Sequence, residues 1–284
     1  MSTSQAPRLF LVDAFGLIFR AFYGRARSAV PSMRTAAGVP TEAVYVFSNM
    51  LRKLVRDHKP DYLAVVWEGE GPTFRDDAFE AYKANREAMP EDLVTQLPLI
   101  RKLLDAMRIP VVKEDGFEAD DSIGALAKQA ADHDVDVFVV SSDKDLMQLV
   151  GDRVWFLNPM KNDMIYDSAG VKDFMGVEPL QIIDLLALKG DAVDNIPGAP
   201  GIGEKGALQL IEEYGSVEGA MAHADEVKRK AYRESLQNNQ EQILLSKKLA
   251  TIAVDAPVTL NLDGLRICDP DLEALRSLYA ELEF

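Results

Sequence analysis

Cysteine is almost absent from this chain, and histidine is rare. Cys268 is the only cysteine in 284 residues, so no disulfide can form within the chain, which suits a reducing cytoplasm. The three histidines lie on segments with helical spacing, and we assign them structural or surface roles: His58, His133 and His223. No stretch approaches the ~20 apolar residues that cross a membrane, and the N-terminus lacks a basic segment followed by an apolar one. The sequence therefore predicts a cytoplasmic protein without a membrane partner.

Basic residues are also fewer than acidic ones: the chain has 31 lysines and arginines and 46 aspartates and glutamates, which gives a net charge of −15. Nucleic-acid-binding proteins usually carry a basic face, so this balance argues at first against such a partner. Nine of the acids fall in a few short motifs, however, and removing their nine charges from −15 leaves −6. If bound cations neutralise those nine, a local basic patch suffices for contact with DNA. They are Asp13, Glu68, Glu118, Asp120, Asp121, Asp143, Asp145, Asp191 and Asp194.

Apolar runs and segments with helical spacing alternate along the first half of the chain. The runs predict strands, and the spacing predicts helices, one of them kinked at Pro98 unless that proline lies early in it. This alternation predicts an α/β fold with a mainly parallel central sheet flanked by helices. The expected strands are 8–13, 61–68, 109–113, 136–143 and 155–158, and the expected helices are 14–24, 42–58, 90–107 and 118–133.

The second half of the chain changes character. From about residue 179 it is helical, with one Gly/Pro-rich interruption over 190–207, and the tail holds one strand-like run, VTLNL, before a terminal helix. We therefore expect an α/β domain over 1–178, a helical subdomain over 179–256 and a C-terminal extension over 257–284.

Three of the expected strands end in or near an acid: Asp13, Glu68 and Asp143. Each acid alone has an ordinary explanation as a turn residue, a helix cap or a solvated loop residue. Binding sites of parallel sheets form beyond the carboxyl ends of the strands, where these three side chains should meet. The sequence therefore predicts an acidic cleft at one edge of the sheet.

Two further motifs add acids to this cleft. GFEADD puts Glu118, Asp120 and Asp121 at a helix start, where the helix dipole stabilises a carboxylate by ~0.3–1 kcal/mol. The helix dipole accounts for one or two acids at this helix start but less well for a third. The second motif, SSDKDL, adds Asp143 and Asp145. Converging carboxylates repel one another unless cations neutralise them. Oxygen ligands without His or Cys favour Mg²⁺ or Mn²⁺, and two such ions ~4 Å apart are a common device for phosphodiester hydrolysis.

The segment GAPGIGEK, residues 198–205, lies between two expected helices. Its glycines allow backbone N–H groups to approach a phosphate, the next helix start adds a favourable dipole, and Lys205 adds a charge. A plain turn between packed helices explains the glycines equally well, but the neighbouring Asp191 and Asp194 favour a functional role.

Five motifs in this order resemble the 5′ nuclease domain of bacterial DNA polymerase I and, more distantly, flap endonucleases. They are LFLVDAFGLIFRAFYG, VVWEGEGPTFRDDAFEAYKANR, GFEADDSIGALA, SSDKDLMQLV and LLALKGDAVDNIPGAPGIGEKGA, and they cover nearly the whole chain. The resemblance implies a PIN-like or resolvase-like nuclease domain with a helix–hairpin–helix subdomain. It also implies that the acids other than Glu68 are metal ligands or neighbours of ligands. We expect Glu68 to join this set, with two or more Mg²⁺ or Mn²⁺ ions.

The resemblance also implies roles for other residues. Segment 69–90 would form a helical arch for a 5′ single strand, with Arg75 and Lys83 facing the scissile phosphate and Asp121 essential for cleavage. The helix–hairpin–helix would bind duplex DNA, with a potassium ion as a further expected ligand. The expected DNA contacts are Arg20, Tyr23, Arg86, Gly198, Gly201, Gly203 and Lys205.

One position departs from the family pattern. The family has Phe-Asp where this chain has Trp67-Glu68. The longer Glu68 side chain must fold back or shift a metal, and Glu70 is a candidate substitute ligand.

The leading expectation is a monomeric 5′→3′ exonuclease and flap endonuclease of replication and repair, acting with a polymerase domain in cis or in trans. Two alternatives stay open: a branched-DNA binder weakened in catalysis by Glu68, and an RNA-cutting PIN nuclease. The Gly-rich segment 190–207 argues against the second.

Overall fold

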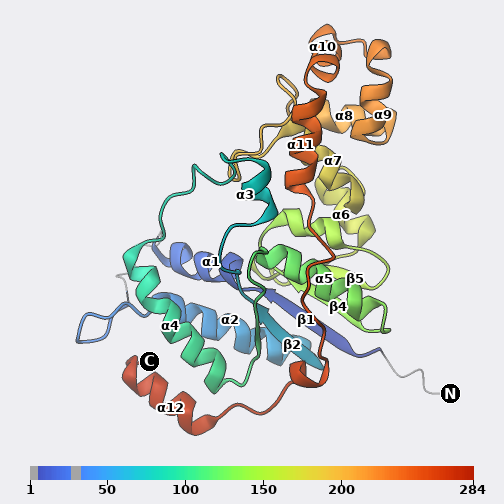
Figure 1. The fold of residues 1–284 in the computed structure, drawn as a ribbon. Coiled ribbons are helices and arrows are strands. Elements are labelled where there is room, and N and C mark those ends of the chain that lie inside the picture. Colours follow the sequence, from blue (N-terminus) through green and yellow to red (C-terminus); the bar gives the residue numbers. More distant parts are fainter. Residues whose placement is uncertain (1–5, 27–32) are drawn as a thin grey trace, which may run out of the picture.

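A computed structural model describes residues 6–26 and 33–284 (Figure 1). Its strands are β1 (Arg8–Asp13), β2 (Tyr62–Val66), β3 (Val111–Val112), β4 (Asp136–Val140), β5 (Val154–Asn158) and β6 (Met164–Tyr166). Its first helices are α1 (Ala14–Ala26), α2 (Glu42–His58), α3 (Phe74–Ala78), α4 (Glu91–Ala106), α5 (Ala119–Ala131) and α6 (Ser168–Met175). The later helices are α7 (Ile182–Lys189), α8 (Glu204–Tyr214), α9 (Val217–Ala222), α10 (Lys230–Asn238), α11 (Gln240–Ala250) and α12 (Leu272–Glu281).

The strands form one sheet in the order β3-β2-β1-β4-β5-β6, and only β6 is antiparallel to its neighbour. Strand β1 lies between β2 and β4 and pairs in parallel with both. Because β1, β2 and β4 run in the same direction, their carboxyl ends share one edge. The predicted α/β fold with a mainly parallel sheet is confirmed.

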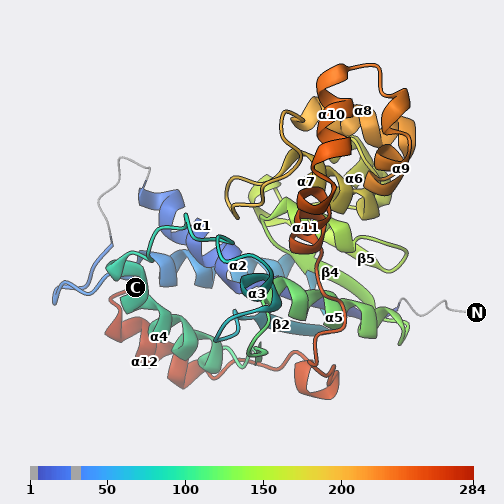
Figure 2. The same ribbon diagram turned by 45° about the horizontal axis from the view of Figure 1, so that its top comes forward.

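Helices cover both faces of the sheet (Figure 2). Side chains alternate along β1, so Leu9 and Leu11 pack in the core that includes α5, whereas Phe10 and Val12 pack with α1 and α2 on the other face. Helix α12 lies beside α4 on the outside of that second face. Strands buried on both faces explain the continuous apolar runs in the sequence.

Helices α7 to α11 form a separate group beyond the carboxyl edge of the sheet (Figure 1). Helix α7 packs against α8 and α11, and the loop from Gly190 to Gly203 connects α7 to α8. The chain then returns along α5, where Gln129 hydrogen-bonds to the backbone of Val258 and Leu260, and ends in α12. None of the helices in the described ranges is long and apolar enough to span a membrane.

Several expectations from the sequence differ from the structure. The VTLNL run, residues 258–262, forms no strand, because its backbone is held by Gln129 of α5 and not by a neighbouring strand. Helix α4 contains Pro98 in its interior, so this proline does not end the helix. The expected helical arch over 69–90 contains only the short helix α3 followed by turns, since Phe79 is extended and Lys83 has a φ of 53°.

Candidate active site

Asp13 is the last residue of β1 and is fixed at the floor of a cleft. Its carboxylate accepts hydrogen bonds from the backbone N–H of Gly16 at 2.9 Å and from the Ser141 hydroxyl at 2.6 Å. A Cβ atom at Gly16 would lie 2.0 Å from Asp13 Oδ2, so only glycine fits there. The middle of the sheet therefore holds this side chain in one position.

Asp143, Asp120 and Glu68 lie near Asp13, and Glu118 lies near Asp120 and Glu68. Desolvation raises the pKa of Asp120 well above its usual value, and the charges of Asp143, Asp13, Glu118 and Glu68 raise it further. Desolvation likewise raises the pKa of Glu68, with Glu118 and Asp13 adding to the effect. The predicted convergence of acids in one cleft is therefore present in the structure.

A second acidic group adjoins the first. Asp143 joins the two groups, because desolvation and the charges of Asp194 and Asp191 raise its pKa. Desolvation, followed by the charges of Asp143 and Asp191, raises the pKa of Asp145 to about 7. Asp145 Oδ1 is also buried without a hydrogen-bond partner among the described residues. A buried, unpartnered carboxylate oxygen beside like charges suits a cation.

The acids are not preassembled around one point. Within the described ranges, no three His, Cys, Asp or Glu side chains are placed so that they could hold a metal ion together. Repulsion between like charges keeps the carboxylates apart. In addition, Lys83 and Arg86 hydrogen-bond to carboxylate oxygens of Glu118 and Asp194. The carboxylate chemistry of the cleft fits Mg²⁺ or Mn²⁺, but these ligands would have to move closer together on binding.

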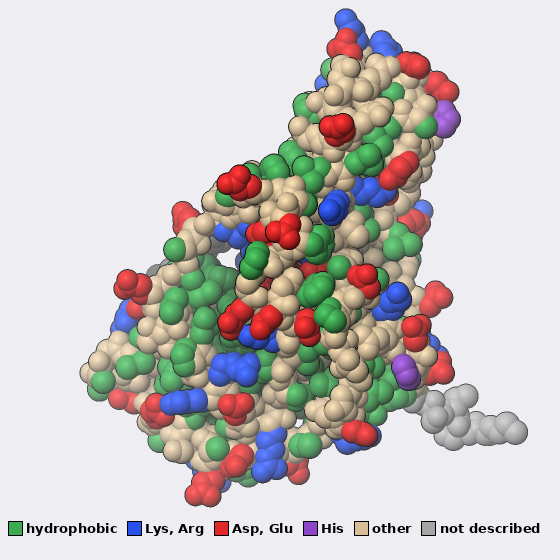
Figure 3. Space-filling model, in the orientation of Figure 1, with side chains coloured by type: hydrophobic (Ala, Val, Ile, Leu, Met, Phe, Trp, Pro, Cys, Tyr) green, Lys and Arg blue, Asp and Glu red, His purple; other side chains and the backbone are tan. Residues whose placement is uncertain are grey.

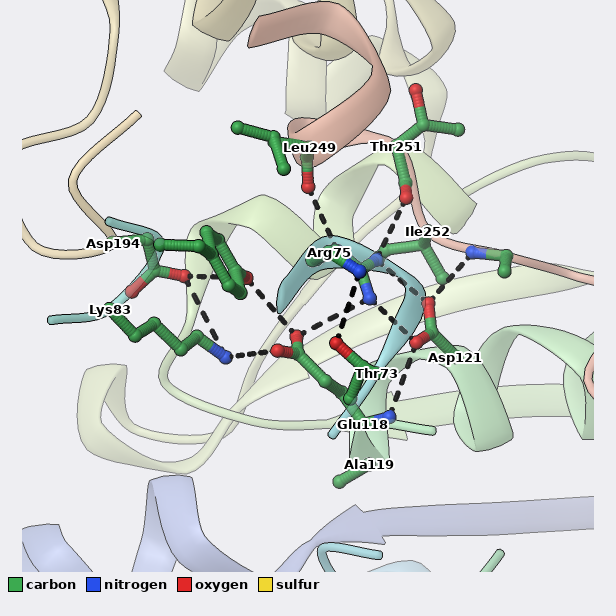
Figure 4. Close-up of polar contacts among 12 residues, drawn as sticks. Thr73, Arg75, Lys83, Glu118, Ala119, Asp121, Asp194, Leu249, Thr251 and Ile252 are labelled. Atoms are coloured by element: carbon green, nitrogen blue, oxygen red, sulfur yellow. Dashed lines mark hydrogen bonds and ion pairs between the residues drawn. The ribbon is translucent and has the colours of Figure 1, made fainter. Parts of the chain in front are cut away.

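Lys83, from the turns after α3, points toward Glu118 and Asp194 (Figure 4), and Arg86 from the same turns also pairs with Asp194. Lys83 Nζ lies 2.6 Å from Glu118 Oε1 and 3.9 Å from Asp194 Oδ2, and Arg86 lies 2.5 Å from Asp194 Oδ1. The backbone N–H of Lys83 also donates to the carbonyl of Asp194, which fixes the turn against the loop after α7. The cations of segment 69–90 thus pair with predicted metal ligands.

Arg75 and Asp121 pair with each other, whereas their sequence motifs predict a phosphate contact for Arg75 and a metal for Asp121. The Arg75 side chain is 2% exposed and donates to both Asp121 oxygens, at 2.7 and 2.8 Å, and to the carbonyls of Leu249 and Thr251 (Figure 4). Asp121 also accepts from the backbone N–H groups of Glu118 and Ala253, so all its acceptor sites are used. In this arrangement Arg75 cannot face a phosphate, and Asp121 has no free oxygen for a metal.

Glu68 lies in the cleft, but Glu70 does not. The Glu68 carboxylate accepts a hydrogen bond from the Ala119 N–H at 3.2 Å, which places it at the start of α5. The Glu70 side chain is 83% exposed and pairs with Lys113. The expectation that Glu70 compensates for the longer Glu68 is therefore wrong, because Glu70 points to solvent.

An open hollow of about 290 Å³ adjoins the cleft along α1. Arg20 and Tyr23 line it together with Phe19 and Ser142, the residue before Asp143. Tyr23 is 41% exposed and stacks on Phe19 with ring centroids 6.2 Å apart. Both predicted DNA contacts of α1 are thus available beside the acids.

The Gly-rich loop lies between α7 and α8, as its sequence predicts. Gly198 and Gly201 have φ of 67° and 78°, and a Cβ at Gly198 would lie 2.4 Å from the nitrogen of Gly190. Gly203 precedes the first turn of α8 without a side-chain cap, and Lys205 is exposed in that turn. The loop leaves the backbone N–H groups at the start of α8 without a capping side chain.

Two residues of the cleft escaped the sequence analysis. Ser141 donates to Asp13 and accepts from the Asp143 N–H at 2.9 Å, so it links the ends of β1 and β4. The Tyr82 hydroxyl lies 3.3 Å from Glu118 Oε2 and 3.4 Å from Asp194 Oδ2. Desolvation and these two acids raise the pKa of Tyr82, so its hydroxyl stays a donor. Its position directly before Lys83 was the available signal.

Comparisons with protein families match almost the whole chain. A model described as "5′-3′ exonuclease, N-terminal resolvase-like domain" matches residues 8–176, and one described as "5′-3′ exonuclease, C-terminal SAM fold" matches residues 177–273. DNA polymerase I of Rhizobium leguminosarum is 45% identical over 271 residues, which is 92% of this chain and 26% of the polymerase. DNA polymerase I of Bacillus caldotenax is 40% identical over 98% of this chain and 31% of the polymerase. The chain thus spans about a quarter to a third of these relatives.

Solved structures share the fold at lower identity. A bacteriophage T5 flap endonuclease, crystallised as a pseudo-enzyme–product complex with DNA and metal ions, matches with a TM-score of 0.72 and 22% identity. That match covers 98% of this chain and all of the other. The catalytic core of Rad2 in complex with DNA substrate matches with a TM-score of 0.63 and 16% identity, over 98% of this chain and 88% of the other.

Proposed function

Since the chain belongs to the 5′-3′ exonuclease family that forms the N-terminal region of DNA polymerase I, we propose that it hydrolyses DNA phosphodiester bonds at 5′ ends and 5′ flaps. It acts as a 5′→3′ exonuclease and as a structure-specific flap endonuclease. Its role is the removal of flaps and RNA primers in replication and repair, as a monomer with a polymerase domain in cis or in trans.

The observation that carries this proposal is the acidic cleft. Desolvation, followed by the charges of neighbouring carboxylates, raises the pKa of Asp120 and of Asp143 there, and Asp145 Oδ1 is buried without a partner in the described ranges. Bound Mg²⁺ or Mn²⁺ ions would activate water and stabilise charge on the attacked phosphate. Asp121 is left out of the proposed ligand set because Arg75 occupies its oxygens. The set is Asp13, Glu68, Glu118, Asp120, Asp143, Asp145, Asp191 and Asp194.

Lys83 and Arg86 supply the basic side of the site. In the structure they neutralise Glu118 and Asp194, which are proposed ligands. When cations take over those two carboxylates, the ammonium and guanidinium groups become available for the scissile phosphate, where they stabilise developing charge. The Tyr82 hydroxyl lies between the same two acids and keeps them oriented during this exchange.

The hollow on α1 and the Gly-rich loop are the proposed DNA contacts. Arg20 binds a phosphate next to the cut, and the ring of Tyr23 stacks on a neighbouring base. The loop binds duplex DNA through backbone N–H groups without reading sequence, aided by Lys205 and by a potassium ion at the loop. The proposed loop contacts are Gly198, Gly201, Gly203 and Lys205.

A cleavage assay on a 5′-flap DNA with Mg²⁺, then Mn²⁺, then a chelator tests the proposal. We expect short products with either metal and none with the chelator. Flap binding without cutting under both metals would favour the branched-DNA binder, and preference for a matched RNA flap would favour a PIN-type nuclease. Glu68→Asp restores the family residue and should raise activity with Mg²⁺ more than with Mn²⁺.

A further inference from the structure

A cavity of about 310 Å³ lies at the opposite end of the sheet from the acidic cleft. It is bounded by the second half of α2, the start of β2, the turn after α4 and the segment before α12. Leu63, the second residue of β2, lies on its wall, whereas the acids stand beyond the carboxyl ends of the strands. The cavity is therefore independent of the proposed nuclease site.

The lining combines an apolar surface with three arginines. Val55, Leu63, Met107, Ile109 and Ile267 provide most of the apolar wall, together with two prolines. The arginines are Arg52, Arg56 and Arg108, and no acid or neutral amide, hydroxyl or aromatic residue lines the cavity. This composition is unusual in a chain with a net charge of −15.

Two of these arginines have no ion-pair partner among the described residues. Arg56 pairs with its exposed neighbour Asp57 at 2.7 Å. Arg52 and Arg108, in contrast, form no ion pair with any residue in the described ranges. Arg108 also has a φ of 52°, in the left-handed region where glycine is favoured. The turn after α4 thus carries a cation at a position where glycine would fit the backbone better.

We propose that this cavity binds a small amphipathic anion. Its apolar body lies against Val55, Met107 and Ile267, and its carboxylate, phosphate or sulfate is held by Arg52 and Arg108. The volume lies at the lower end of the range for small-molecule sites, about 300–1,000 Å³. A second cavity of about 300 Å³ shares Arg52 and Met107 and continues along α12 to Tyr279, which leaves room for a longer apolar body.

A nucleotide fits this lining less well than an anion with an apolar body. The edges of a base carry donors and acceptors that need polar partners when buried. The first cavity offers neither a neutral polar side chain, apart from the thiol of Cys268, nor an aromatic ring for stacking. The ligand class is therefore distinct from the nucleotides that a nuclease releases.

Fluorescence titration with 8-anilinonaphthalene-1-sulfonate, itself an aromatic amphipathic anion, tests the proposal. We expect one saturable site in the folded protein. Arg108→Gly should weaken binding at least about tenfold, because a charge-assisted contact is lost, while the protein still folds since glycine suits the backbone there. Arg52→Ala should act likewise, and Lys128→Ala, an exposed cation on α5, should change nothing. Unchanged affinity in both arginine variants, or no saturable binding, would overturn the proposal.

Cys268 provides a second measurement because the chain's only thiol lines this cavity. We expect the bound sulfonate to slow alkylation of Cys268 by iodoacetamide, and Arg108→Gly to abolish that protection. Decanoate should compete with the probe, whereas deoxyadenosine 5′-monophosphate should not. Labelling that is indifferent to the probe would place its site elsewhere, and competition by the nucleotide would refute the apolar-body assignment.

Discussion

Arg75 and Asp121 form a bidentate ion pair that is closed to solvent, with side chains 2% and 0% exposed. The pair joins α3 to α5, and the two carbonyls bound by Arg75 extend the connection to the end of α11. It therefore holds together the segment that carries Lys83, the helix start that carries Glu118, and the helical group beyond the sheet.

Removing one partner of this pair should destabilise the whole protein. Asp121→Ala removes the bidentate partner of the buried Arg75 guanidinium and leaves only Glu118, 3.6 Å away, to offset its charge. We expect a loss at the lower end of about 3–5 kcal/mol in the free energy of unfolding. Urea unfolding at neutral pH measures the loss. Asp77→Ala, an exposed acid of the same short helix α3, is the control and should change stability little. Wild-type stability in Asp121→Ala would mean that the pair is not structural.

Gly16→Ala should impair cleavage by displacing Asp13. The new Cβ would lie 2.0 Å from Asp13 Oδ2, so the carboxylate must leave the position set by Ser141. We expect kcat on a 5′ flap to fall at least about tenfold. Gly151→Ala, in the turn before β5, meets no atom within 4 Å and should leave kcat unchanged. Equal activity of the two variants would contradict the assigned role of Asp13.

Lys83→Met should separate cation binding from cleavage. Glu118 loses the ammonium group at 2.6 Å, so its carboxylate becomes available and Mn²⁺ should bind more tightly. Turnover should nevertheless fall, because the charge proposed for the scissile phosphate is gone. Calorimetric titration with Mn²⁺ and a flap assay measure the two effects.

Lys113→Met is the matched control for Lys83→Met. Lys113 pairs with the exposed Glu70 outside the cleft, so neither Mn²⁺ affinity nor turnover should change. A loss of Mn²⁺ affinity in Lys83→Met would argue that Lys83 does not compete with the metal.

The metal-free protein should become less stable as the pH rises. Desolvation and neighbouring acids raise the folded-state pKa of Asp145 to about 7, above its unfolded value of 3.8. The protonated form is therefore favoured by folding, and its contribution is complete below the unfolded pKa and lost as the pH rises through the folded pKa. Thermal melting in chelator should show a falling midpoint between pH 4 and pH 8.

Asp145→Asn isolates this contribution, because the amide does not titrate. Its midpoint should fall less steeply over the same pH range. Added Mg²⁺ should stabilise the wild type more at pH 8 than at pH 5, since the ionised carboxylates bind cations. A wild-type midpoint that rises toward pH 8 in chelator would contradict the assignment.

The sequence predicted the sheet and the edge at which its acids meet, because both follow from local patterns. Apolar runs mark the strands; Asp13 ends one of them, and Asp143 follows another after two serines. The pairing of Arg75 with Asp121 could not be foreseen, since the pocket around it is completed by Leu249 and Thr251, more than 120 positions beyond Asp121. Local patterns carry no information on such distant contacts.

Other differences have similar causes. VTLNL has the composition of a strand, but no sheet edge lies beside it, and the side chain of Gln129 binds its backbone instead. The exposed side chain of Glu70 follows from its contact with Lys113 across the fold. The distribution of charged side chains on the surface does not mark the site, because acidic and basic side chains are interspersed over the face shown in Figure 3.

Strand β1 is paired on both sides, and Asp13 is its final residue. Amide hydrogens in such a central strand exchange with water only during large-scale opening, whereas turns such as those around Lys83 open at far lower cost. Local opening of the hydrogen bond between the Lys83 N–H and the Asp194 carbonyl would therefore leave Asp13 in place. Passage of substrate thus depends on local opening of the turns, whereas the position of Asp13 depends on the much higher stability of the central strand.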